Sequence, residues 1–391
     1  MEIYLVGGAV RDRRLGLPVR ERDWVVVGAT PQELLSQGYK PVGRDFPVFL
    51  HPDSKEEYAL ARTERKTGPG YTGFETRADP TITLEEDLRR RDLTINAMAE
   101  TPEGELIDPY GGAEDLDNGV LRHVSPAFAE DPVRILRVAR FAARFAHWGF
   151  RVAHQTNALM RQMVENGEVD HLVPERVWSE FARALETRTP ERFFDVLYGC
   201  GALARLFPEI EPLYRQPPPS RHGHRDNMFP ALRSSVAQDA DPAIRCAALG
   251  CDISRSAGSA FNFRHLAAMC ARLHAPTAWR DLAMLSLKIR ERVQAADTLP
   301  AEDLLDLLCD LDAWRRGDRF EDILQVCQAD AGLPDDAANY PPTAVLRAAR
   351  AATAAVRIDD YVTATKNGKA IAGELRKRRI RAIQEIPGQT Q

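Results

Sequence analysis

Two carboxylates lie one residue apart at the start of an apolar run: Glu21 and Asp23 belong to the stretch ERDWVVVG. Side chains alternate along a β-strand, so both carboxylates are expected on the same face. Such a pair is costly unless cations lie between the oxygens, and Mg²⁺ prefers carboxylate oxygens together with substrate phosphates. Two such ions can stabilise the attacking and leaving oxygens of a phosphoryl displacement. The pair therefore predicts a Mg²⁺ site, with Glu57 on a later strand as a candidate third carboxylate.

A glycine pair stands just upstream, in the stretch IYLVGGAVRD. Glycine lets backbone N–H groups approach a triphosphate closely, and the start of a helix favours anions. Gly8 lies at this start, and Arg11 follows as a candidate clamp for phosphate. By itself, an E-x-D beside a G-G is more often a solvated strand end and a turn, because short motifs match by chance. The prediction of a site therefore depends on further motifs.

Composition limits the class of protein. The chain has 391 residues, of which 44% are hydrophobic, and no apolar run approaches the roughly 18 residues of a membrane span. Its six cysteines form no C-x-x-C pair, and the N-terminus has no signal-peptide pattern, which predicts a cytoplasmic protein with reduced thiols. The net charge is −5, yet arginines cluster at 89–91, along 134–144 and at 376–381. RNA therefore remains a candidate partner, because clustering matters more than net charge.

The elements that would position these residues differ between the two ends of the chain. Short apolar stretches at 3–8, 23–28, 46–51 and 57–62 predict strands, and Thr30 with Glu33 predicts a capped helix between the second and third. Residues 65–80 are rich in glycine and predict a mobile loop. From about residue 125 the pattern is helical. Over 125–150 the apolar residues share one side of a helix, and four arginines, at 134, 137, 140 and 144, share the other.

Several motifs in a fixed order carry a resemblance. After the G-G-x-x-R-D and E-x-D patterns come RTE at 62–64, RRDLTINAMA at 90–99, DPYGG at 108–112 and EDPVRILRVARF at 130–141. Together they resemble the class II tRNA nucleotidyltransferases, which comprise the CCA-adding enzymes and the bacterial poly(A) polymerases. The match extends from residue 1 to about 215. The short N-terminus before the glycine pair is more similar to the tRNA enzymes than to the polymerases.

The resemblance implies an α+β fold with three parts. A nucleotidyltransferase head with a small mixed β-sheet is expected over 1–122, followed by an elongated all-α neck, body and tail. The neck is expected over 123–215, and the Pro-rich stretch 215–227 separates it from a helical C-terminal domain over 228–391. The implied reaction is template-independent addition of CCA to the 3′ end of tRNA from CTP and ATP, with Mg²⁺ as cofactor and pyrophosphate released.

The resemblance also implies roles for single residues. An acceptor and a forked donor, Asp131 and Arg134, are three apart on a helix and match the hydrogen-bonding edges of C and A. Glutamate at 21 replaces the family's first aspartate and keeps its charge. The implied assignments are metal ligation by Glu21 and Asp23, contacts to the incoming nucleotide by Gly8 and Arg11, ribose and phosphate contacts by Arg91, Asp92 and Asn96, base reading by Asp131 and Arg134, and further nucleotide contacts by Arg137 and Arg140.

The second half departs from the family. Many bacterial members carry a metal-dependent phosphohydrolase domain with an H…H-D…D ligand set, but this chain reads Cys251-Asp252 where H-D would fall. His222 and His224 lie in the Pro-rich break and are more typical of a surface loop than of a metal site. The expectation is a helical scaffold without its metal site that contacts tRNA. The basic tail at 376–381 either helps in this contact or forms a disordered end.

Three alternatives remain open at this point. A partial-adding enzyme, which adds only A or only CC, or a poly(A) polymerase would share every motif above. A metal-dependent phosphohydrolase is disfavoured by the missing H-D ligands, and a catalytically inactive RNA-binding protein is disfavoured by the retained site residues. The sequence leaves the oligomeric state open between monomer and homodimer.

Overall fold

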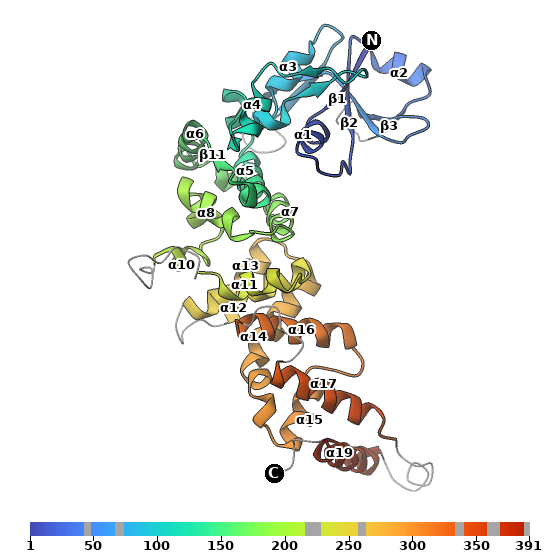
Figure 1. The fold of residues 1–391 in the computed structure, drawn as a ribbon, viewed down its shortest axis with the longest axis vertical. Coiled ribbons are helices and arrows are strands. Elements are labelled where there is room, and N and C mark those ends of the chain that lie inside the picture. The colour runs from blue at the N-terminus through green and yellow to red at the C-terminus, as the bar shows by residue number, and fades with distance from the viewer. Residues whose placement is uncertain are drawn as a thin grey trace. The chain divides into compact units, whose positions relative to one another are not determined.

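The computed structural model describes residues 1–42, 48–66, 74–215, 228–256, 263–332, 340–357 and 368–386. The chain divides into two compact units, Met1–Pro208 and Glu209–Gln391. The first unit combines a sheet with helices, and the second is helical throughout its described residues (Figure 1). This confirms the predicted change from an α+β head to an all-α remainder. Among the described residues, no helix has the length and apolar character needed to span a membrane.

A seven-stranded mixed sheet forms the framework of the first unit. Its strand order is β3-β4-β5-β2-β1-β8-β9; β2 and β5 are parallel, and the other neighbours are antiparallel. The registers place Val6 opposite Asp23 and Asp23 opposite Glu57. The end of β1 and the start of β2 therefore meet where the glycine pair and the carboxylates were expected. The strands are β1 (Glu2–Val6), β2 (Asp23–Val27), β3 (Lys40–Val42), β4 (Val48–Leu50), β5 (Glu57–Leu60), β8 (Ala99–Glu100) and β9 (Leu106–Ile107).

Alternation along β2 gives the sheet a core on each face. Val25 packs with Leu84 and Leu88 of helix α3 (Leu84–Arg89), whereas its neighbour Val26 packs with Leu34 of helix α2 (Pro31–Ser36). Both helices begin with a capping box, and the one on α2 is the predicted pair of Thr30 and Glu33. The remaining short elements of the head are α1 (Gly8–Arg14), the 3₁₀-helix η1 (Thr94–Asn96) and α4 (Gly112–Asp117).

The region predicted as a loop over 65–80 contains strands instead. β6 (Arg62–Lys66) pairs antiparallel with β7 (Phe74–Ala78) in a separate two-stranded ribbon. Residues 67–73 lie outside the described residues. Glycine and proline are concentrated in that middle part, so their signal obscured the flanking strand residues such as Phe74 and Thr76.

Helices complete the first unit. The helix expected to run through 125–150 is interrupted: the 3₁₀-helix η2 (Pro126–Glu130) ends before Pro132, and α5 starts at Val133. Proline favours the first turn of a helix and lacks the N–H that would continue one. The elements are α5 (Val133–Phe145), η3 (Ala146–Trp148), α6 (His154–Glu165), η4 (Glu168–His171), α7 (Pro174–Leu185), α8 (Glu191–Cys200) and α9 (Ala202–Leu206), with the short parallel pair β10 (Val120–Leu121) and β11 (Arg151–Val152).

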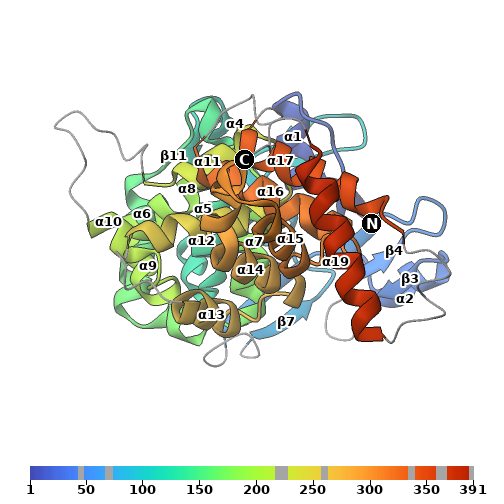
Figure 2. The ribbon, with the colours of Figure 1, turned by 90° about the horizontal axis from the view of Figure 1, so that it is seen from below.

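The second unit is built from packed helices. Helix α12 packs against α11, α14 and α16, and α17 packs against α15 and α19. The basic tail at 376–381 belongs to α19, the long red helix in Figure 2, so the alternative of a disordered end is wrong for these residues. The helices are α10 (Glu211–Arg215), α11 (Pro230–Ala237), α12 (Pro242–Ser256), α13 (Phe263–Arg272), α14 (Thr277–Gln294), η7 (Ala296–Thr298), α15 (Ala301–Asp310), α16 (Gly317–Asp330), α17 (Pro341–Ala354) and α19 (Gly368–Gln384).

Candidate active site

The two predicted metal ligands lie at the start of β2. Asp23 is the first residue of this strand, while Glu21 lies two residues before it, outside the strand. Both residues are exposed, and neither side chain has a hydrogen bond or ion pair with any described residue. Desolvation by the protein around the Asp23 carboxylate raises its pKa; nearby Glu21 raises it further, and Arg91 opposes both. Unpaired carboxylates of this kind fit a divalent cation, because their oxygen lone pairs are available.

The third candidate carboxylate does not complete a larger ligand set. Glu57 is in register with Asp23 on the neighbouring strand β5. Within the described part of the chain, however, no three His, Cys, Asp or Glu side chains gather as metal ligands. The metal-binding candidates are therefore the pair Glu21 and Asp23. The two histidines that were expected in a surface loop, His222 and His224, fall in 216–227, outside the described residues.

The turn at Gly7 and Gly8 follows the end of β1, which lies opposite Asp23 at the start of β2. We call this region, with Glu21 and Asp23, the site corner. Gly7 has φ of +71° and donates its N–H to the carbonyl oxygen of Met98 at 3.0 Å. The positive φ favours glycine at this position, and a Cβ here would lie 2.8 Å from Nη1 of Arg91 and would displace that guanidinium. Gly8 begins α1 as predicted. The turn thus brings the Arg91 guanidinium beside the backbone of the glycine pair and within electrostatic range of Asp23.

Arg11 is placed differently from the expected phosphate clamp. Its side chain is buried: the guanidinium donates to Asn96 Oδ1 and to Asp12 Oδ1, and lies 5.0 Å from the ring centre of Phe141. Burial lowers the pKa of Arg11, and Asp12 counteracts this effect. In this arrangement Arg11 ties α1 to η1 and α5. The sequence pattern located it at the turn but could not show that it points into the protein.

Asp92 forms the centre of a buried polar group. Its Oδ1 accepts from the amide of Asn96 at 3.0 Å, and its Oδ2 accepts from Nε of Arg137 at 2.6 Å. Burial by itself would raise the pKa of Asp92, but Arg137 and Asn96 together bring it well below its usual value. The group therefore holds an ionised carboxylate in place. The two other residues of this stretch that are predicted to contact ribose and phosphate, Arg91 and Asn96, lie on either side of Asp92 in the chain.

Three of the four arginines in the stripe of α5 pair with carboxylates. Arg137 pairs with Asp92, Arg140 pairs with Glu180 of α7 at 2.5 Å, and Arg144 pairs with Asp12 at 2.9 Å. The partners come from three other parts of the chain. No acid is interleaved among these arginines in the sequence, and the tertiary structure supplies the acidic partners. Arg137 and Arg140 thus connect the helical part of the first unit to its sheet part and to α7.

Asp131 and Arg134 do not share one helix. Asp131 lies in extended conformation between η2 and α5, where its Oδ1 accepts from the N–H of Val133 at 3.1 Å. Arg176 of α7 binds both of its oxygens, at 3.0 and 2.7 Å. Arg134 donates to the carbonyl oxygens of Ala127 and Arg90, at 2.9 and 2.6 Å. The helical spacing argument for this pair is therefore wrong, although both side chains lie at the start of α5.

Two residues that the sequence analysis missed hold this region together. Arg176 fixes Asp131, and Glu180, which is buried, fixes Arg140. They stand four apart on α7, so both project from the same face of that helix. The sequence does contain a signal for them: two opposite charges stand four residues apart, next to the apolar residues Val177 and Phe181, which are buried.

Comparisons with known proteins identify the family of the chain. The model of the "Poly A polymerase head domain" family matches residues 3–122, and that of the "Probable RNA and SrmB- binding site of polymerase A" family matches residues 149–214. Proteins named multifunctional CCA protein resemble the whole chain. The one from Nitrosococcus oceani is 52% identical and covers 98% of each chain; the one from Thioalkalivibrio sulfidiphilus is 53% identical and covers 99% of this chain and 98% of its own.

Solved structures share the fold. The Thermotoga maritima CCA-adding enzyme complexed with tRNA has a TM-score of 0.67 at 22% identity, over 100% of this chain and 88% of that one. A CCA-adding enzyme in complex with ATP has a TM-score of 0.66 at 22% identity, over 98% of this chain and 86% of that one. The similarity therefore extends beyond the head into the helical remainder.

Proposed function

The chain belongs to the family of the multifunctional CCA proteins, and we infer that it is a tRNA nucleotidyltransferase. It adds CCA to the 3′ end of tRNA from CTP and ATP and releases pyrophosphate. The observation that carries this proposal is the corner of the head where unpaired Glu21 and Asp23 adjoin the Gly7 turn and Arg91.

The cofactor is a divalent metal ion, and we propose Mg²⁺. Glu21 and Asp23 would hold it, since their oxygens are free of other partners among the described residues. When bound, the metal stabilises the negative charge on the attacking 3′-hydroxyl oxygen and on the leaving pyrophosphate. Arg91 supplies a fixed positive charge beside the glycine turn, where it would contact the phosphates of the incoming nucleotide. Gly8 leaves room for those phosphates.

Base selection is proposed for the region at the start of α5. Asp131 offers acceptors and Arg134 offers a forked donor, and both are held by neighbours and therefore preorganised. Asn96, Asp92, Arg137 and Arg140 are held in the same way by hydrogen bonds and ion pairs, and they would support the nucleotide from behind, together with the buried side chain of Arg11. The division into head (1–122), neck (123–215) and C-terminal domain (228–391) and the cytoplasmic location remain predictions.

Primer extension tests the proposal. Transcripts of tRNA that end before CCA, after C and after CC are incubated with Mg²⁺ and with CTP, ATP or both. Ordered addition of C, C and A that then stops supports the proposal. Addition of A alone, or of CC alone, would indicate a partial-adding enzyme, and unlimited addition of A would indicate a poly(A) polymerase. No incorporation by the wild-type chain, on any transcript, would contradict the proposal.

A further inference from the structure

A buried carboxylate marks the place in the second unit where the sequence departs from its family. Asp252 of α12 is 1% exposed, and its two oxygens accept the N–H groups of Ala231 and Leu232, each at 2.9 Å. These N–H groups belong to the first turn of α11, which has no helical acceptor for them. Oδ1 of Asp252 also accepts from the guanidinium of Arg255, one turn further along α12. Asp252 thus caps the N-terminus of the neighbouring helix α11.

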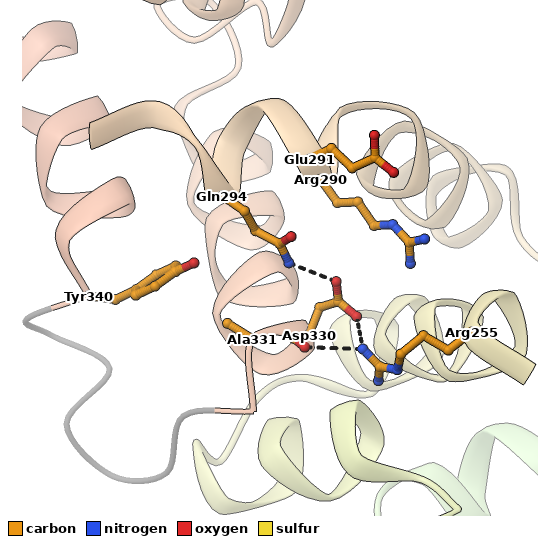
Figure 3. A pocket seen from close by; sticks show the side chains of 7 residues that line it. All are labelled: Arg255, Arg290, Glu291, Gln294, Asp330, Ala331 and Tyr340. Atoms are coloured by element: carbon orange, nitrogen blue, oxygen red, sulfur yellow. Dashed lines mark hydrogen bonds and ion pairs between the residues drawn. The ribbon is translucent and has the colours of Figure 1, made fainter. Parts of the chain in front are cut away.

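The same guanidinium reaches a second carboxylate. Arg255 donates to Oδ1 and to the backbone carbonyl of Asp330 at the end of α16, and Oδ2 of Asp330 accepts from the amide of Gln294 on α14 at 2.8 Å (Figure 3). The Asp330 side chain is only 5% exposed. All four carboxylate oxygens therefore accept hydrogen bonds, and one arginine connects the two acids. Four helices, α11, α12, α14 and α16, meet in these contacts.

A divalent metal does not fit this arrangement. A metal held by two carboxylates needs free lone pairs and a position between the carboxylate oxygens. Here the Arg255 guanidinium holds the position between the two acids. This guanidinium and three N–H donors bind the oxygen lone pairs. Arg255 and Asp330 line a cavity of about 440 Å³, and Arg290 adds a second positive charge to this lining (Figure 3). The Arg290 guanidinium donates to Ser254 Oγ at 3.2 Å. The lining also holds the carboxylates of Asp330 and Glu291, so the two cations offset negative charge that would otherwise attract a metal ion.

We infer that the Arg255 guanidinium serves as a built-in cation between Asp252 and Asp330, so that the second unit is held together without a divalent metal and has no metal-dependent phosphohydrolase activity at this cavity. The inference is independent of the proposed transferase function, because it concerns different residues in a different unit. It sets this chain apart from any relative whose additional functions need a metal at the equivalent position. Arg255 is here a structural residue, and its charge is what matters.

Metal binding is the first test, made on the full chain carrying Glu21→Gln and Asp23→Asn to remove the head's ligands. Titration with Mn²⁺, followed by electron paramagnetic resonance, is expected to show no tight site. Hydrolysis of p-nitrophenyl phosphate with Mn²⁺ or Ni²⁺ is expected to equal that of the same chain with Asp252→Asn. A tight Mn²⁺ site that Asp330→Asn removes, or a hydrolysis rate that Asp252→Asn lowers, would overturn the inference.

Stability is the second test, and Arg292 provides the matched control. Arg292 of α14 pairs with Asp310, but both side chains are largely exposed, at 42% and 55%. Arg255→Met leaves two buried carboxylates without their cation and is expected to lower Tm by about 5 °C or more. Arg292→Met is expected to lower it by about 1 °C or less. Asp330→Asn added to Arg255→Met should restore part of the loss. Equal losses for both arginines would contradict a bridging role for Arg255.

Discussion

The two units treat carboxylates in opposite ways. In the head, Glu21 and Asp23 lie at the surface without a hydrogen bond or ion pair among the described residues. In the second unit, Asp252 and Asp330 are buried, and every oxygen accepts from a donor. A carboxylate with free lone pairs can take a cation from solution, whereas a saturated one contributes only to the fold. The same residue type therefore indicates a site in one unit and a structural contact in the other.

The contrast also holds within the first unit. Asp92, Asp131 and Glu180 surround the candidate site, yet each is paired with an arginine from another element. Their charge is fixed before any ligand arrives, so they preorganise the site instead of binding metal. The exposed pair Glu21 and Asp23 differs from them by lacking such arginine partners. Partner atoms, more than residue type, separate the two roles.

The largest expected effect tests the free carboxylates. Asp23→Asn should lower the rate of nucleotide addition by about 100-fold or more, because it removes charge that stabilises the transition state. Its effect on Tm should stay within about 1 °C, since Asp23 makes no hydrogen bond or ion pair with described residues. Primer extension and thermal unfolding measure the two quantities. Asp117→Asn, at an exposed position of α4, is the control and should change neither. A large loss of stability in Asp23→Asn would break the contrast between the units.

Part of this contrast could be predicted from the sequence. The strands around the glycine pair, the Thr30–Glu33 capping box and the position of Asp23 follow from local patterns, which the structure bears out. Local patterns work there because turn chemistry and side-chain alternation act over a few residues. The change from an α+β head to helices is visible for the same reason.

The partners of the charged residues could not be predicted. Arg137 and Asp92 are 45 residues apart, Arg176 and Asp131 are also 45 apart, and Arg255 and Asp330 are 75 apart. Nothing local distinguishes an arginine that meets a buried acid from one that faces water. Arg11 shows the same limit, because its spacing fits a surface clamp while packing against Phe141 buries it.

The second prediction concerns the paired carboxylate Asp92. Arg137→Met leaves this buried acid without its cation and should lower the free energy of unfolding by about 3 kcal/mol at pH 7. The pKa of Asp92 is lowered in the folded chain, so the stabilisation is present above the unfolded pKa of about 4 and is lost as pH falls. Denaturant unfolding at several pH values measures this. The deficit of the variant should shrink below pH 4; a deficit that is constant down to pH 2 would mean that the pair with Asp92 is not its cause.

The third prediction is that Asp252, the buried acid of the second unit, changes the stability of the chain with pH in the opposite direction to Asp92. Burial raises the pKa of Asp252 to about 6, although the N–H groups of Leu232 and Ala231 and the charge of Arg255 oppose it. The folded chain then binds a proton more tightly than the unfolded chain. This group's contribution to stability is therefore present below pH 4, is lost between pH 4 and 6, and is constant above. The loss should be about 3 kcal/mol, and Asp252→Asn should abolish this slope in the difference between parent and variant. Equal slopes in parent and variant would contradict the assignment to Asp252.

The smallest expected effect comes from replacing either of two glycines that share a backbone conformation, one of which lies in the site corner. Gly7 and Gly16 have φ of +71° and +68°, so alanine is strained at both, by about 1 kcal/mol. A Cβ at Gly16 would meet no atom within 4 Å, whereas one at Gly7 would meet Arg91 Nη1 at 2.8 Å. Gly7→Ala must therefore also displace the Arg91 guanidinium, whose charge acts on Asp23. It should lower primer extension by about 10-fold, with a rise in KM for nucleotide, while Gly16→Ala should leave activity unchanged. Equal activities for the two variants would mean that Arg91 need not lie beside the turn, and the unpaired carboxylates alone would then define the corner.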